Sequence, residues 1–160
     1  SSAWIRKSLR LNPYQPALLM LNVYNLQQAG DNQAALAQMQ ELESIGVENL
    51  DLWTSLAQQI MKTDLPAAIK LLNRVINQKP LHITALNSRA TMYLANQEID
   101  FALADWALSL DIDPHQANVY FLRAQVRYDS GDREGACYDW KKALRNGHRK
   151  ALDKLYKYCE

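Results

Sequence analysis

The chain has 160 residues, of which 48% are apolar and 22% are charged, which is typical of a folded domain rather than a disordered segment. Its 18 Lys and Arg are balanced by 17 Asp and Glu, so net charge gives no reason to expect a nucleic-acid partner. The apolar runs are far shorter than the roughly 20 residues that cross a bilayer, so we expect no membrane insertion. Five glycines and five prolines are too few for a β-sandwich, and composition therefore predicts a mostly helical domain.

The first predicted element is a helix over residues 3–11, which ends at the pair Asn12-Pro13 because proline disfavours a helix before it. Its apolar residues are Trp4, Ile5, Leu9 and Leu11. No partner helix precedes it in the sequence. We expect either the second helix of a repeat in a longer array, of which this chain is a fragment, or an N-terminal cap.

Four helix–turn–helix units follow, at residues 16–48, 49–82, 83–116 and 117–149. Each has two apolar stretches of helical spacing, separated by a polar turn. In the first and last units the turn is Gly-Asp, since glycine tolerates the left-handed backbone that ends a helix and aspartate caps the next one. One constant shift along the sequence superimposes Pro80 on Pro114, and Ala102-x-x-Asp105-Trp106 on Ala136-x-x-Asp139-Trp140.

This repeat resembles the tetratricopeptide repeat (TPR) family over about the whole chain. The matching positions are a small residue in the first helix, a small residue that opens the second, a bulky residue four positions later and a proline at the boundary. They are occupied by Ala90 and Ala124; by Ala35, Ala68, Ala102 and Ala136; by Met39, Leu72, Trp106 and Trp140; and by Pro80 and Pro114. Val23 and Leu56 depart from the pattern, because a small residue is usual there.

The resemblance implies an all-α fold, a right-handed α–α superhelix (solenoid) of about four repeats in a single domain over residues 1–160. Stacking is expected because a lone pair of helices cannot bury its apolar faces. A capping helix is predicted over residues 148–160, with its helical part from His148 to Tyr158. The end of the chain is basic and is either a solvated cap or a docking site for an acidic surface. Its cations are Lys141, Lys142, Arg145, Arg149, Lys150, Lys154 and Lys157.

Two cysteines, Cys137 and Cys159, lie at nearly equal distances from Gly147. If the last two helices pack antiparallel, both sulfurs lie at the same end of the pair. They either form a disulfide, which implies an oxidising compartment, or are two unlinked buried thiols. The last unit also looks like those of bacterial TPR proteins. We therefore expect a periplasmic or cell-envelope location rather than a cytoplasmic one.

An arginine and an aspartate occur at the same spacing in two consecutive units, as Arg89 with Asp105 and Arg123 with Asp139. The spacing places the arginine on the first helix and the aspartate on the second. We expect a structural ion pair inside each repeat, although a recognition role for the arginines is the alternative.

No catalytic motif is present in the sequence. It has no H-E-x-x-H, no G-x-S-x-G, no phosphate-binding glycine loop and no C-x-x-C. His82 and His115 fall at repeat junctions and are predicted to be polar loop residues. We therefore expect no enzymatic activity, no cofactor and no metal site.

The expected binding surface is the concave groove, which the first helices line in TPR proteins. Counting inward positions along each first helix predicts groove residues Met20, Tyr24, Trp53, Asn87, Thr91, Asn118, Phe121, Gln125 and Tyr128, with Gln27, Leu50, Ala57 and Thr84 at the remaining positions. The basic residues with which some family members hold a peptide carboxylate are missing. The mixture of aromatic and amide side chains suits an uncharged extended segment or a helix instead.

The predicted function is a non-catalytic scaffold that binds a peptide or a partner protein in this groove. One alternative is an assembly or transport accessory in which the array acts as a rigid spacer. A nucleic-acid-binding module, which depends on the basic end alone, is the least favoured.

Overall fold

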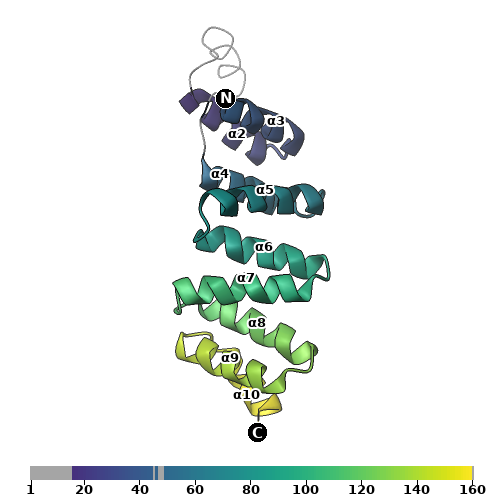
Figure 1. Cartoon of the computed structure of the whole chain (residues 1–160), viewed down its shortest axis with the longest axis vertical. Helices are drawn as coiled ribbons and strands as arrows, with labels where there is room; N and C mark the ends of the chain where they lie inside the picture. The colour runs from purple at the N-terminus through teal and green to yellow at the C-terminus, as the bar shows by residue number, and fades with distance from the viewer. Residues whose placement is uncertain (1–15, 45, 47–48, 160) are drawn as a thin grey trace. The chain divides into compact units, whose positions relative to one another are not determined.

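The computed structural model describes residues 16–44, 46 and 49–159, which form helices and no strand (Figure 1). The helices are α2 (Pro16–Gln28), α3 (Asn32–Ser44), α4 (Leu50–Ile60), α5 (Leu65–Gln78), α6 (Ile83–Ala95), α7 (Ile99–Ile112), α8 (Ala117–Asp129), α9 (Arg133–Arg145) and α10 (Ala151–Tyr158). Consecutive helices pair as the hairpins α2–α3, α4–α5, α6–α7 and α8–α9, and α10 packs on α9. The predicted all-α helical-repeat fold is confirmed.

Within the described residues, no helix has the length and apolar character required to span a membrane. The helix predicted over residues 3–11 lies outside the residues that the structure describes.

The helices group into two compact units. The first unit ends at Gln78 and holds α2 to α5, and the second begins at Lys79 and holds α6 to α10. The second has a core of its own, which includes Trp106 and Trp140. A single domain over the whole chain stays a prediction.

Small residues allow the two helices of each hairpin to approach closely. The alanines that open the second helices, Ala35, Ala68, Ala102 and Ala136, are all 0% exposed. The first helices of the second unit contribute Ala90 and Ala124, also fully buried. In the first unit the larger Val23 and Leu56 are buried just as completely, so these hairpins accommodate a branched side chain at the crossing.

The turn inside the third hairpin differs from the turns of the first and fourth hairpins. Gly30 and Gly131 close the first and fourth hairpins with positive φ angles of 75° and 90°. The equivalent residue of the third hairpin is Gln97, which has a φ of 63°. The residue that follows is an aspartate in the first and fourth hairpins and caps the second helix with its side chain, whereas Glu98 makes no such cap bond. The α6–α7 turn therefore lacks both residues that suit this geometry.

The last helix, α10, begins at Ala151, later than the predicted start at His148. Residues 148–150 instead form a turn in which the Ala151 N–H donates to the His148 carbonyl. Tyr158 occupies the position that Ala90 and Ala124 hold in the first helices, one repeat further along the chain. Its ring lies 4.5 Å from that of Tyr128 and 5.8 Å from that of Trp140, so α10 fills this space with an aromatic ring.

Candidate interaction surfaces

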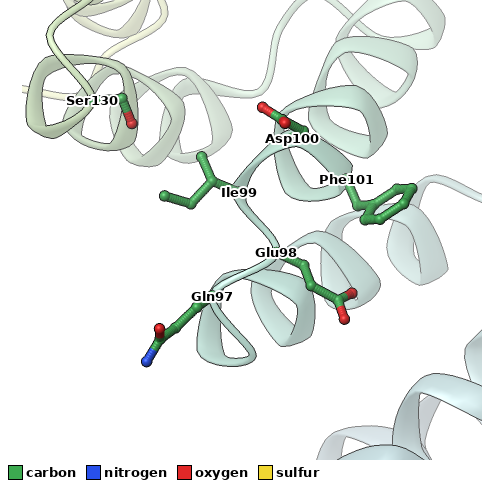
Figure 2. Close-up of a pocket in the computed structure, with 6 residues that line it drawn as sticks. All are labelled: Gln97, Glu98, Ile99, Asp100, Phe101 and Ser130. Carbon is green, nitrogen blue, oxygen red and sulfur yellow. The ribbon is translucent and has the colours of Figure 1, made fainter.

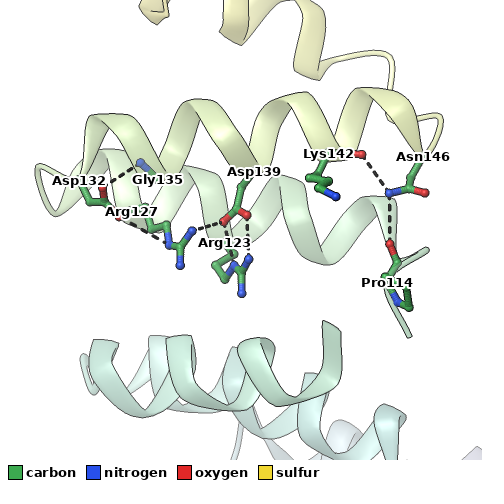
Figure 3. Close-up of polar contacts among 8 residues, drawn as sticks. All are labelled: Pro114, Arg123, Arg127, Asp132, Gly135, Asp139, Lys142 and Asn146. Carbon is green, nitrogen blue, oxygen red and sulfur yellow. Dashed lines mark hydrogen bonds and ion pairs between the residues drawn. The ribbon is translucent and has the colours of Figure 1, made fainter. Parts of the chain in front are cut away.

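The arginine–aspartate pairs join the two helices of each hairpin in the second unit. Arg89 contacts Asp105 through Nε–Oδ2 and Nη2–Oδ1 at 2.8 and 2.7 Å, and Arg123 contacts Asp139 with the same two distances (Figure 3). The hydrogen bond to Asp105 raises the pKa of the Arg89 guanidinium, against the opposing effect of burial. Arg123 is only 8% exposed and offers little surface to a partner.

Asp139 is the more heavily used carboxylate. It is completely buried, and Arg127 Nη1 donates a further hydrogen bond of 3.0 Å to its Oδ2. Figure 3 shows both guanidinium groups, from α8, directed at this one side chain of α9. The third contact escaped the sequence analysis, because Arg127 has no counterpart in the preceding repeat, where Tyr93 stands.

The same pair of positions is polar but uncharged in the first hairpin. Asn22 Nδ2 donates to Gln38 Oε1, across the same sequence separation as in the two ion pairs. This pair was not predicted, although Asn22 and Gln38 have the same spacing in the sequence as the two ion pairs. In the second hairpin the two positions hold Ser55 and Leu71, so this cross-link changes from an amide pair to an ion pair along the chain.

Amide side chains also join consecutive hairpins of the second unit. Asn87 Nδ2 donates to Gln116 Oε1 at 2.6 Å, and Gln116 Nε2 donates to the Ser109 carbonyl at 2.8 Å. At the end of α9, Asn146 Nδ2 donates to the Pro114 and Lys142 carbonyls (Figure 3). Asn87, predicted to face a partner, is thus engaged within the fold.

The predicted groove residues differ widely in exposure. Tyr24 is 53% exposed, and Thr91 and Asn118 are also exposed. Met20, Asn87, Phe121, Gln125 and Tyr128 are half-buried. Gln125 donates to Asp129, and the Phe121 ring stacks on His148 with 4.0 Å between centroids. Of the remaining inward positions, Gln27 and Ala57 are buried.

Trp53, which was predicted at an inward groove position, is packed between helices. It is 4% exposed, and the Arg74 guanidinium lies 4.7 Å from its ring centroid. Its side chain contributes to a pocket of about 600 Å³ that α3 and α5 otherwise line. Arg74 also forms an ion pair with Glu43 across this pocket. Because the Arg74 side chain covers it, Trp53 offers little surface to a partner. It contributes instead to a pocket that second helices mainly line.

His82 is not a simple loop residue. It is 8% exposed, and its Nδ1 accepts a hydrogen bond from the Ala85 N–H as the N-cap of α6. His115 is exposed. Among the described residues no cluster of His, Cys, Asp or Glu is suited to hold a metal ion.

A disulfide and a side-chain hydrogen bond connect the C-terminal helix to α9. Cys137 and Cys159 form a disulfide with their Cα atoms 5.7 Å apart, and Arg133 Nε donates to the Tyr158 carbonyl at 2.7 Å. Lys154 and Lys157 lie over the Tyr158 ring. Leu152 and Tyr156 are 57% and 74% exposed on the outer side of α10.

One apolar surface was not anticipated from the sequence. Phe101 and Leu108 of α7 are 61% and 40% exposed, and a pocket of about 370 Å³ lies at the start of this helix (Figure 2). Residues 97–101 and Ser130 line it. The signal was present in the sequence, because both apolar residues fall outside the positions that the repeat pattern requires.

The comparisons with solved structures identify the fold. The crystal structure of MamA superimposes with a TM-score of 0.81 at 21% identity, covering 92% of this chain and 87% of that one. YrrB, described as a TPR protein with an unusual peptide-binding site, gives 0.78 at 20% identity, covering 97% and 81%. TTC0263, a TPR protein of Thermus thermophilus, gives 0.64 at 19% identity, covering 99% and 87%.

Sequence similarity to a known protein extends over a small part of that protein. No family model matches the chain. Bacteriophage adsorption protein A of Escherichia coli (strain K12) is 28% identical over 132 residues, which are 82% of this chain. The chain spans only 13% of the length of that relative.

Proposed function

From its TPR fold, we propose that this chain is a non-catalytic protein-interaction module that holds an extended, uncharged peptide segment on the first helices of its second unit. The observation that carries the proposal is the chemistry of α6 and α8. Their exposed side chains include Thr84, Thr91 and Asn118, with Leu122 45% exposed beside them. Hydroxyl and amide groups pair with peptide N–H and carbonyl groups, and the leucine adds apolar contact.

The arginines Arg89 and Arg123 of these helices form ion pairs within the fold. The Arg89 and Arg123 guanidinium groups pair with aspartates of the second helices. A partner that depended on a carboxylate would find no free arginine in these pairs. The peptide-binding site of YrrB supports a peptide ligand for this fold.

We also propose a periplasmic or cell-envelope location. The disulfide between Cys137 and Cys159 supports it, because such bonds persist in oxidising compartments. The likeness to a protein named for bacteriophage adsorption also supports it, since adsorption takes place at the cell surface.

The test is selection of a displayed peptide library on the purified chain, followed by fluorescence anisotropy with the selected peptides. Asn118→Ala and Thr91→Ala should each weaken binding by about three- to tenfold, which is the contribution of one hydrogen bond. Tyr138→Ala, an exposed residue of the second helix α9, is the matched control and should leave binding unchanged. Selected peptides that bind all three variants as tightly as the unmodified chain would contradict the proposal.

A further inference from the structure

The outer stripe of α7 has a composition that the fold does not require. We define the α7 stripe as Asp100, Phe101, Ala104, Leu108 and Asp111, which are all exposed and recur at the spacing of one helix face. The Phe101 ring lies 5.3 Å from that of Tyr93, yet this contact leaves Phe101 61% exposed, and Leu108 is 40% exposed on the same face. Burial of an apolar side chain is favourable, so two large apolar residues left this exposed on one face indicate an interaction site.

The other hairpins show which residues occupy the equivalent face elsewhere in the chain. At the positions equivalent to Phe101, the chain has the small residues Ala34, Ala67 and Gly135. At the positions equivalent to Leu108, it has the charged residues Glu41, Arg74 and Lys142. The repeat therefore folds without an apolar residue at either position, and α7 alone among these four helices has a large one at both.

Charge identifies the kind of partner. Residues 90–122 contain five Asp or Glu and no Lys or Arg. Asp100 and Asp111 bracket the apolar residues, and no cation within the described residues pairs with either carboxylate. Asp111 lies in the last turn of α7, where the helix dipole is negative and no basic residue compensates it. The Asp111 carboxylate and the negative end of the helix dipole repel each other, and a cationic partner would offset this repulsion.

The pocket at the start of α7 fits the same partner. Its polar lining residues are Gln97, Glu98, Asp100 and Ser130, with no basic residue among them. Figure 2 shows Phe101 directed away from Ile99, on the side to which the Glu98 carboxylate also points. A lysine or arginine side chain that entered here would meet oxygen acceptors while its neighbours covered Phe101.

We propose that the α7 stripe docks an amphipathic helix of a partner protein, with apolar residues against Phe101 and Leu108 and a Lys or Arg at each end. The separation of Asp100 from Asp111 corresponds to about 16 Å along the helix. The two cations of the partner helix should therefore be separated by about the same number of residues as these aspartates. This surface is separate from the first-helix face of the proposed function.

The test uses the whole chain and two labelled synthetic helices, each with a leucine stripe. One has Lys at two positions with the spacing of Asp100 and Asp111, and the other has Glu there. We expect the Lys peptide to bind at least tenfold more tightly than the Glu peptide, with affinity that falls as salt is added. Phe101→Ser with Leu108→Ser should weaken its binding at least tenfold, and Asp100→Lys with Asp111→Lys should reverse the preference between the peptides.

The matched control is Leu152→Ser with Tyr156→Ser, which removes exposed apolar residues from the basic helix α10 and should leave binding unchanged. Because all the substituted residues are exposed, circular dichroism should show the same helicity in every variant. Failure of the unmodified chain to bind the Lys peptide overturns the proposal, as does equal binding by the Phe101/Leu108 variant. Sedimentation that shows a dimer abolished by this variant would assign the stripe to a second copy instead. Asn118→Ala, which tests the proposed function, should not affect the Lys peptide.

Discussion

At the scale of single residues, the left-handed Gln97 is a site where the fold accepts strain. A residue with a side chain is destabilised by roughly 1–2 kcal/mol at a positive φ. Glycine avoids this strain, but part of the gain is offset because glycine makes the unfolded chain more flexible. Gln97→Gly should therefore raise the free energy of unfolding by about 0.5–1 kcal/mol, measured by urea denaturation. Gly131→Ala, at the equivalent turn with a φ of 90°, is the reciprocal variant and should lower it. A loss of stability in Gln97→Gly would show that the glutamine side chain contributes more than its backbone costs.

The buried carboxylate of Asp139 gives a larger effect at the same scale. Asp139→Ala leaves Arg123 and Arg127 without their shared acceptor, and we expect a loss of about 3–5 kcal/mol. Asp105→Ala should cost less, because the Arg89–Asp105 pair is more exposed, with side chains 17% and 9% accessible against 9% and 0%. Thermal melting of both variants checks the order. An unchanged melting temperature for Asp139→Ala would refute the structural role.

At the scale of elements, the sequence predicted the helices better than it predicted the surfaces. The helical repeat was predictable, because alanine spacing and turn residues act locally, and the structure has helical hairpins along the described residues. Trp53 is buried although it occupies an inward position, since Arg74 of another helix covers it. Phe101 is exposed, and the only sign of this in the sequence is its place outside the repeat pattern. Periodicity locates a face of a helix, but neighbouring elements decide what covers that face.

The end of α7 carries a stability cost that substitution should remove. Asp111 is an exposed carboxylate in the last turn, where a cation interacts favourably with the helix dipole. Asp111→Lys should raise stability by about 0.3–1 kcal/mol at low ionic strength, measured by urea denaturation, and salt should diminish the gain. Asp111→Asn is the control for loss of charge alone and should give roughly half of the gain. A destabilised lysine variant would mean that Asp111 has a structural partner.

The helix α10 depends on its covalent link. The disulfide closes a loop with a sequence separation of 22 residues, for which chain entropy gives about 3 kcal/mol. Replacing both cysteines by serine should lower the stability of the second unit by about that amount. Limited proteolysis should then cleave near α10 first. Arg133→Ala, which removes the 2.7 Å bond to the Tyr158 carbonyl, should have a smaller effect, and equal effects would argue that the disulfide adds little.

At the scale of the whole molecule, the division after Gln78 has a direct test. The second unit holds two hairpins and a disulfide-linked helix around its own core, which is the content of an independently folding domain. A chain of residues 79–160 should show helical circular dichroism and a cooperative thermal transition. A gradual transition without a baseline would show that the second unit needs the first, as a single domain would.

The position held by Tyr158 has a consequence for growth by duplication. A repeat protein can be lengthened when the first helix of each module has a small residue, such as Ala90 or Ala124, against which the next helix packs closely. On α10 the Tyr158 ring stands at that position and packs against Tyr128 and Trp140. To graft a further module directly onto α10, Tyr158 would first have to be replaced by a small residue.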